Sequence, residues 1–369
     1  MTHMQRRDNL SRRLRAAELD ALLVSDLNNV RYLSGFTGSN AALLVFADER
    51  PAVLATDGRY RTQAARQAPD LETVIERACG LALSRRAAAE GAARLGFEGH
   101  ILTVDAFEQL RRGLSTNGDE SIDLVRASGT VEQLREVKDA GEIALLRLAC
   151  EAADAALADL IERGGLRPGR SEKQVRNDLE ALMLDHGADG PSFETIVAAG
   201  PNSAIPHHRP TDAVLVEGDF VKIDFGALVG GYHSDMTRTF VLGRAKDWQL
   251  EIYDVVATAQ RAGTEALADG VACSAVDGAA RRIIAAAGYG ETFSHGLGHG
   301  VGLQIHEAPG INATAAGTLL AGSAVTVEPG VYLPDRGGVR IEDTLVVPGE
   351  GHAPELLTRF PKELLILTK

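Results

Sequence analysis

Acidic residues in the second half of the chain stand inside segments that are otherwise apolar. Asp224 lies in the run FVKIDF, and Asp235 follows 11 residues later, beyond a Gly230-Gly231 turn. Two apolar runs joined by a glycine turn are typical of a β-hairpin, which would bring both carboxylates within cross-strand reach. Two buried like charges repel each other, so they need a proton, a cationic partner or a metal ion.

Three further segments carry the same kind of residues. SHGLGHGVGLQIHE places His295, His299 and His306 among closely spaced glycines, and VTVEPG and VRIEDT place Glu328 and Glu342 in β-branched runs. The glycine segment has neither the G-x-G-x-x-G nor the Walker pattern of a phosphate loop, and its final His-Glu pair is not part of an H-E-x-x-H zinc helix. The glycines would instead let backbone and ligands approach closely.

The candidate metal ligands are four carboxylates and one imidazole: Asp224, Asp235, His299, Glu328 and Glu342. Each one alone has an ordinary interpretation, as a strand-end charge or a core histidine. Their occurrence together favours a metal site, because two divalent ions would balance about four buried negative charges. Oxygen-rich ligation with a single nitrogen suits Mn²⁺, with Zn²⁺, Co²⁺ or Fe²⁺ as alternatives.

Composition limits the classes of function. The 369 residues include 38 Lys and Arg against 51 Asp and Glu, and this net charge of −13 argues against a nucleic-acid partner. We find no apolar run of about 18 residues that could cross a membrane, and the basic N-terminus lacks the apolar core of a signal peptide. The 3 cysteines are far apart without a CxxC pattern, which indicates a reducing compartment, so we expect a cytoplasmic protein.

The elements that must position these residues fall into two domains. Residues 1–130 alternate helix-like and strand-like segments, such as the apolar runs 22–24 and 41–46, and indicate a smaller α/β domain. A highly charged stretch at 132–139 marks the boundary, so the second domain is expected over residues 131–369.

The second domain groups its helices and strands in pairs. Capping patterns at Asp139 and Ser171 predict two helices, and helices are also expected over 248–267 and 274–287. Strands are expected in the hairpin over 219–242 and at 324–327, 339–347 and 364–367. This grouping favours an α+β fold over a strictly alternating parallel sheet.

The constellation resembles the five-ligand signature of the pita-bread metallopeptidases. Asp224…Asp235…HGLGHGVGLQIHE…VEPG…RIEDT carries the likeness, and TIVAAGPNSAIPHHRP and EPGVYLPDRGGVRIEDT are most similar to the proline-specific branch. NNVRYLSGFTGSNAALLV followed by DGRY is similar to the creatinase-like N-terminal domain of that branch. The resemblance therefore implies a C-terminal pita-bread (creatinase/aminopeptidase) catalytic domain preceded by a smaller α/β domain.

The resemblance also implies a role for each ligand. Asp224 would chelate one of two divalent metal ions, Asp235 and Glu342 would bridge both, and His299 and Glu328 would complete the other.

Other residues match positions around the substrate. His295 and His306 match the substrate-side histidines, and His207 matches a histidine on the preceding loop, with the adjacent His208 as the alternative. Two further residues, Tyr232 and Arg340, match positions that support the ligands, although a strand tyrosine and a solvated arginine are equally ordinary interpretations.

The expected activity is hydrolysis of Xaa-Pro bonds in proline-containing peptides by a hydroxide that bridges two metal ions, with Glu328 as the proton shuttle. The short chain favours an Xaa-Pro dipeptidase (prolidase), and an aminopeptidase P acting on longer peptides is the alternative. A creatinase-like hydrolase or a non-catalytic binding protein on this fold is disfavoured by the intact ligand set. The family resemblance also implies a homodimer.

Overall fold

A computed structural model describes residues 1–115 and 122–368 of the chain. The chain divides into two compact units, Met1–Arg135 and Glu136–Lys369, which we call the N-terminal and C-terminal units. The division falls inside the charged stretch at 132–139, a few residues beyond the expected boundary at residue 130.

The N-terminal unit is built on one mixed sheet with the strand order β4-β3-β2-β1-β5-β6. Its central strands β1 and β2 pair antiparallel, and β5 adds to β1 in parallel, so the two expected apolar runs form the middle of the sheet. In chain order its elements are α1 (His3–Ala16), β1 (Ala21–Val24), α2 (Leu27–Ser34), β2 (Ala41–Phe46), β3 (Val53–Thr56), η1 (Gly58–Tyr60), α3 (Arg61–Gln67), β4 (Glu72–Ile75), α4 (Cys79–Ala89), β5 (Arg94–Phe97), α5 (Val104–Ser115), β6 (Asp123–Arg126) and α6 (Glu132–Arg135).

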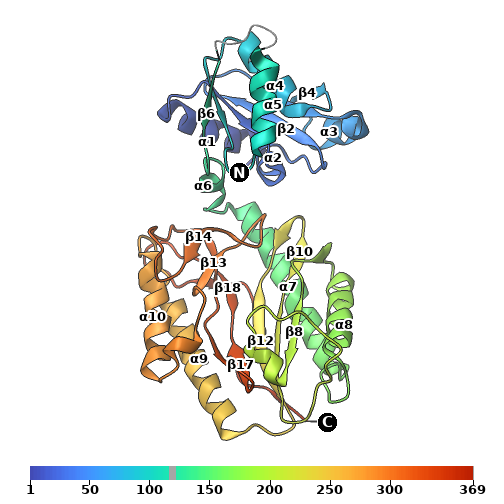
Figure 1. The fold of residues 1–369 in the computed structure, drawn as a ribbon, viewed down its shortest axis with the longest axis vertical. Coiled ribbons are helices and arrows are strands. Elements are labelled where there is room, and N and C mark those ends of the chain that lie inside the picture. Colours follow the sequence, from blue (N-terminus) through green and yellow to red (C-terminus); the bar gives the residue numbers. More distant parts are fainter. Residues whose placement is uncertain (116–121, 369) are drawn as a thin grey trace. The chain divides into compact units, whose positions relative to one another are not determined.

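The helices of the C-terminal unit flank its strands in two pairs (Figure 1). The pair α7 (Ala140–Glu162) and α8 (Glu172–Asp185) begins at the two expected capping boxes, on Asp139 and Ser171. Apolar side chains of this pair pack against β9 and β12, whereas α9 (Asp247–Glu265) and α10 (Cys273–Ala286) pack against strands of the last third of the chain.

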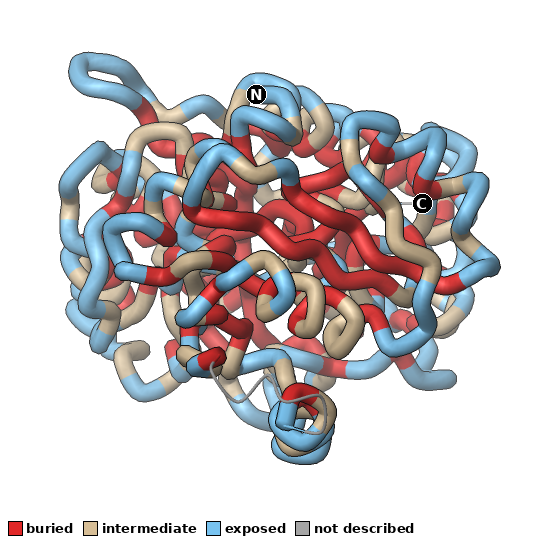
Figure 2. Tube along the Cα trace, turned by 90° about the horizontal axis from the view of Figure 1, so that it is seen from above, coloured by how far each residue is buried: buried red, intermediate tan, exposed pale blue. Residues whose placement is uncertain are grey.

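The strands of the C-terminal unit form several sheets, with the orders β20-β12-β9-β8, β14-β13-β15-β18-β19, β11-β10-β7 and β16-β17. Figure 2 shows that buried residues lie along extended segments of the chain, whereas exposed residues lie mostly along connecting loops. The elements are β7 (Gly190–Pro191), β8 (Ile196–Ala199), η2 (Gly200–Ala204), β9 (Phe220–Phe225), β10 (Ala227–Val229), β11 (Tyr232–His233), β12 (Met236–Leu242), η3 (Gly290–Thr292), β13 (Gly298–Gly300), β14 (Glu307–Ile311), β15 (Ala324–Val327), β16 (Gly330–Leu333), β17 (Gly337–Arg340), β18 (Asp343–Val346), β19 (Glu355–Leu356) and β20 (Ile366–Leu367).

The expected hairpin between the two aspartates is confirmed. Val229 pairs with Tyr232 across a two-residue turn, and β9 and β12 continue the antiparallel pairing. Gly230 and Gly231 adopt φ values of 55° and 80°, which non-glycine residues rarely tolerate in such a turn. The hairpin sets Asp224 opposite Thr237, two residues after Asp235.

The expectation of a single strand over 339–347 was wrong. β17 ends at Arg340 and pairs with β16, whereas β18 begins at Asp343 and pairs with β15 in another sheet. The chain changes sheets at Ile341 and Glu342, and Glu342 donates its backbone N–H to the Thr237 carbonyl (3.1 Å). This change of sheet places the Glu342 side chain beside the hairpin.

The glycine-rich segment forms strands where the backbones are tightly packed. A Cβ at Gly298 would lie 2.0 Å from the Thr326 carbonyl oxygen, and one at Gly300 would lie 2.1 Å from that of Ala308. Both contacts are to backbone, which cannot rotate away. The glycines on either side of His299 therefore let β13 approach its neighbours closely.

We expect Gly298→Ala to destabilise the protein by about 1–3 kcal/mol or more, because overpacking forces the backbone to shift. Gly310→Ala, on the paired strand β14, is the matched control, since a Cβ there meets its nearest atom at 3.5 Å. Urea unfolding of the two variants measures the difference. If the two variants were equally stable, the close approach of β13 to its neighbouring strands would be contradicted.

Two further expectations concern the described residues. Cys79, Cys150 and Cys273 are buried and unbridged, as their spacing predicts. None of the helices in the described ranges has the length and apolar character needed to span a membrane.

Candidate metal centre

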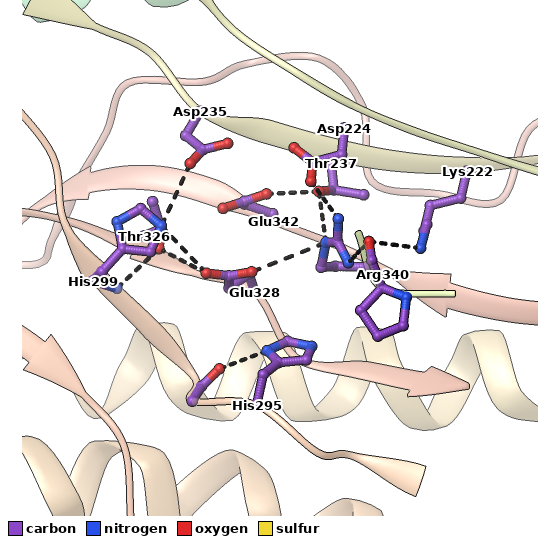
Figure 3. Close-up of polar contacts among 12 residues, drawn as sticks. Lys222, Asp224, Asp235, Thr237, His295, His299, Thr326, Glu328, Arg340 and Glu342 are labelled. Atoms are coloured by element: carbon purple, nitrogen blue, oxygen red, sulfur yellow. Dashed lines mark hydrogen bonds and ion pairs between the residues drawn. The ribbon is translucent and has the colours of Figure 1, made fainter. Parts of the chain in front are cut away.

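The five expected ligands lie together, although they come from five separate parts of the chain (Figure 3). Asp224 comes from β9 and His299 from β13, Asp235 directly precedes β12, Glu328 directly follows β15, and Glu342 lies between β17 and β18. They line a cavity of about 280 Å³. Its other lining residues are Phe193, Glu194, Ile196, His207, His208, Arg209, Ile305, His306 and Arg340.

His299 presents a lone pair to the carboxylates. Its Nδ1 donates to the Gly300 carbonyl (3.0 Å), which places the proton on that nitrogen and leaves Nε2 as an acceptor. Burial lowers the pKa of His299 to about 4, so the ring is neutral at pH 7. Nε2 then lies 3.5 Å from Asp235 Oδ2 and 3.4 Å from Glu328 Oε1, an arrangement of acceptors that suits a cation between them.

The positive charge near these carboxylates is too small to neutralise them. Burial first, and then the neighbouring carboxylates, raise the pKa values of Asp235 and Glu342 well above the ordinary range. Burial likewise raises the pKa of Glu328 to about 8, with Asp224 adding to the effect and Arg340 opposing it.

Two buried oxygens of the cluster, Asp224 Oδ1 and Glu342 Oε1, make no hydrogen bond. Asp235, His299 and Glu342 each offer one ligand atom, and these atoms lie within 4.8 Å of one another. Buried unpaired acceptors at this spacing fit divalent cations, because a metal ion would satisfy the oxygens and offset their mutual repulsion.

Arg340 lies inside the site, not in solvent. Its side chain is 2% exposed and forms an ion pair with Asp224. The guanidinium also donates to Thr237 Oγ1 (3.0 Å) and Tyr332 Oη (2.7 Å), and its Nε lies 3.9 Å from Glu328 Oε2. Arg340 is thus the buried positive charge that partly offsets the carboxylates.

The two histidines expected on the substrate side, His306 and His295, lie in different parts of the site. His306 packs edge-on against His299, with ring centroids 4.4 Å apart, and lines the cavity. His295 hydrogen-bonds through Nε2 to Tyr332 Oη (2.8 Å) and is not among the residues that line the cavity. Burial lowers the pKa of both imidazoles, that of His295 to about 4, so both are neutral at pH 7.

Two neighbouring histidines were alternatives for one position. His207 and His208 both line the cavity, but the Nε2 atom of His208 lies 2.8 Å from the Glu172 carboxylate and its side chain is buried. His207 is exposed and close enough to His295 and His306 to lower their pKa values. This geometry favours His207 as the residue that faces a substrate.

Tyr232 is not brought to the cavity. Its hydroxyl donates to Glu142 Oε1 (3.0 Å), near the start of α7, and its ring is buried. The neighbours of the ligands are instead Thr237, which donates to Glu342 Oε2 (2.6 Å), and Tyr332. Thr237 has a sequence signal, because it lies two residues from Asp235 and so on the same face of the strand.

The raised carboxyl pKa values predict the pH dependence of the metal-free protein. Between pH 6.5 and 8, folded Glu328, with a pKa of about 8, holds a proton that the unfolded chain releases. Stability therefore falls as pH rises, by at most about 1.4 kcal/mol per pH unit for each such proton. The lowered pKa values of His295 and His299 act below pH 6.5, outside this window.

Urea unfolding in EDTA across this window measures the slope. Excess Mn²⁺ should reverse it, because the ion binds the deprotonated ligands. Stability in EDTA that rose with pH would contradict a buried, uncompensated carboxylate cluster.

Comparison with known proteins agrees with this geometry. The model of Metallopeptidase family M24 matches residues 144–348, and that of the Creatinase/Prolidase N-terminal domain matches residues 6–137. The Xaa-Pro dipeptidase of Pyrococcus horikoshii is 35% identical over 347 residues, which are 94% of this chain and 95% of that protein.

Solved structures give the same result over nearly the whole chain. The Xaa-Pro dipeptidase from Bacillus anthracis superposes with a TM-score of 0.92 at 39% identity, covering 99% of this chain and 100% of that one. The X-Pro aminopeptidase from Thermotoga maritima superposes with a TM-score of 0.86 at 33% identity, covering 96% and 100%. The expected fold is confirmed: a creatinase-type N-terminal domain precedes a pita-bread domain, and the chain belongs to metallopeptidase family M24.

Proposed function

We propose that this metallopeptidase hydrolyses Xaa-Pro bonds with two divalent metal ions, and that dipeptides are its substrates. The observation that carries the proposal is the buried cluster of unpaired carboxylate oxygens around the neutral His299 ring, facing a cavity. Its similarity to proteins named Xaa-Pro dipeptidase supports the choice of bond.

The metal ions would be held by Asp224, Asp235, His299, Glu328 and Glu342. Bound there, two divalent ions supply a hydroxide nucleophile at neutral pH and a Lewis acid for the scissile carbonyl. Asp235 and Glu342, whose carboxylates share the cluster with the His299 imidazole, would each contribute negative charge and ligand oxygens to such ions. We propose Mn²⁺ as the metal, because oxygen ligands dominate the set.

The surrounding side chains would carry out the proton transfers and hold the substrate. Glu328 accepts a proton from the attacking water and passes it to the leaving proline nitrogen. His306 is neutral, lines the cavity and can donate a hydrogen bond to the oxyanion, which is worth about 2.7–4 kcal/mol for one donor. His295 already donates from Nδ1 to the Gly296 carbonyl and accepts from Tyr332 Oη at Nε2, so its proposed role is to hold Tyr332 in place. His207 positions the proline side of the substrate from the mouth of the cavity.

The similarity to proteins named Xaa-Pro dipeptidase favours a dipeptide substrate. An aminopeptidase P activity on longer peptides is the second candidate, favoured by the likeness to the Thermotoga maritima X-Pro aminopeptidase.

Two substrates separate the candidates. We expect Mn²⁺-loaded protein to release proline from Ala-Pro and to leave Ala-Pro-Ala intact, and we expect EDTA to abolish the activity. Cleavage of Ala from Ala-Pro-Ala at a comparable rate would establish the aminopeptidase instead. Hydrolysis of neither peptide by protein with bound metal would overturn both candidates.

We also propose a homodimer in the cytoplasm. The three unbridged cysteines are consistent with a reducing compartment. Sedimentation of the purified protein tests the dimer.

A further inference from the structure

The loop that carries His207 is held by two buried side chains, the carboxylate of Glu172 and the amine of Lys222. The loop follows β8, passes through η2 and includes residues 205–211. Glu172, the first residue of α8, and Lys222, in the middle of β9, are both fully buried beneath it. Buried polar groups are costly unless hydrogen bonds compensate them, so each is expected to have a specific partner.

Glu172 binds the hydrogen-bond donors of the loop. Its Oε1 accepts from the Ala199 N–H (2.9 Å) and the Asn202 side-chain amide (2.9 Å). Its Oε2 accepts from the Thr211 N–H (2.9 Å) and lies 2.8 Å from His208 Nε2. One carboxylate therefore ties the two ends of the loop together and keeps His208 turned toward α8.

Lys222 binds the acceptors in the middle of the same loop. Its Nζ donates to the carbonyls of Ile205 (2.7 Å) and Pro206 (3.3 Å), the two residues directly before His207. The Arg340 guanidinium donates to the same Pro206 carbonyl (3.2 Å; Figure 3). The Lys222 Nζ also lies over the Tyr332 ring, 5.0 Å from its centroid.

We propose that Lys222 is a positioning residue for His207. It does not line the cavity and would not touch a substrate, but it fixes the backbone from which the His207 side chain projects. Through Pro206 it joins this loop to Arg340 and so to the ligand Asp224.

The first test is a double-mutant cycle on Ala-Pro hydrolysis, which rests on the proposed function. Lys222→Met removes both hydrogen bonds and is expected to lower kcat/KM by about 10²-fold, the scale of loss from a 1 Å misplacement. If Lys222 acts through His207, the double variant Lys222→Met/His207→Ala is no slower than His207→Ala alone. Lys222→Arg keeps the donors and should restore part of the activity. The proposal would be overturned if the kcat/KM losses of the two single variants multiplied in the double variant, or if the Lys222→Met enzyme hydrolysed Ala-Pro at the wild-type rate.

The second test needs no substrate. Lys222→Met should accelerate amide hydrogen exchange in residues 203–209 while the affinity for Mn²⁺, measured by calorimetry, stays unchanged. Leu182→Ala, a truncation on the buried face of α8, is the control, because it removes core packing but no hydrogen bond to the loop. If amide exchange in residues 203–209 rose equally in both variants, Lys222 would have only a structural role. If Lys222→Met accelerated exchange in the loop but the wild-type enzyme did not cleave Ala-Pro, the positioning role of Lys222 would stand and the proposed substrate would be rejected.

Discussion

Asp235→Asn should lower kcat/KM for Ala-Pro by about 10³-fold or more and weaken Mn²⁺ binding together with it. The substitution keeps the size of the side chain but removes a charge that is 5% exposed and shares the cluster with His299 and Glu342. Electrostatic stabilisation by a metal ion is worth several kcal/mol, and each 1.36 kcal/mol is a factor of ten in rate.

The control for this variant is Asp212→Asn, which removes a carboxylate that is 84% exposed and forms a surface ion pair with Lys173. It should keep wild-type activity and metal affinity. Calorimetric titration with Mn²⁺ and steady-state kinetics are measured on both proteins. Wild-type turnover by the Asp235→Asn enzyme would show that the carboxylate cluster is not the reaction centre.

Arg340→Met should destabilise the metal-free protein by about 3–5 kcal/mol, the usual cost of removing one partner of a buried ion pair. Arg340 is the buried cation in the ion pair with Asp224, and its loss would leave the Asp224 carboxylate without that partner. Bound metal ions supply positive charge to the same carboxylate, so the loss of stability should be smaller in excess Mn²⁺.

Urea unfolding in EDTA and in excess Mn²⁺ measures both values. Arg340→Lys is the matched variant, because it keeps a charge but cannot reach Asp224, Thr237 and Tyr332 at once. An Arg340→Met protein as stable as the wild type in EDTA would contradict its role as the compensating charge.

The ligand set could be predicted from the sequence because each member breaks a local rule. Asp224, Glu328 and Glu342 each interrupt an apolar, β-branched run, and a carboxylate in such a place needs a compensating partner. The hairpin turn at Gly230-Gly231 added the pairing that brings Asp224 close to Asp235. Short-range patterns therefore sufficed to predict that these acidic side chains would need a shared partner.

The change of sheet at Glu342 was beyond such patterns. Val339 to Val347 contains no glycine or proline to signal a break, and the two halves separate only because β16 and β15 offer different partners. That decision depends on tertiary pairing, which local sequence does not encode. The glycine-rich segment was expected to let backbone and ligands approach closely, and the backbone part of this expectation agrees with the close strand packing at Gly298 and Gly300.

The residues that support the candidate ligands were also difficult to predict from local sequence. Lys222 and Tyr332 stand in ordinary strand sequences, and their roles arise from a loop and an arginine that are distant in sequence. Tyr232 matches a family position, but its hydroxyl is directed to Glu142. Residues that act on the site through others leave little trace in the sequence, because their partners are fixed only when the sheets assemble.

The proposed metal centre is tested most directly by titrating EDTA-stripped protein with Mn²⁺ while following both heat and Ala-Pro hydrolysis. We expect two ions to bind per chain, with activity appearing as the sites fill and both signals lost in Asp235→Asn. Full hydrolysis of Ala-Pro in EDTA, or Mn²⁺ binding unchanged by Asp235→Asn, would contradict a metal centre built from these five side chains.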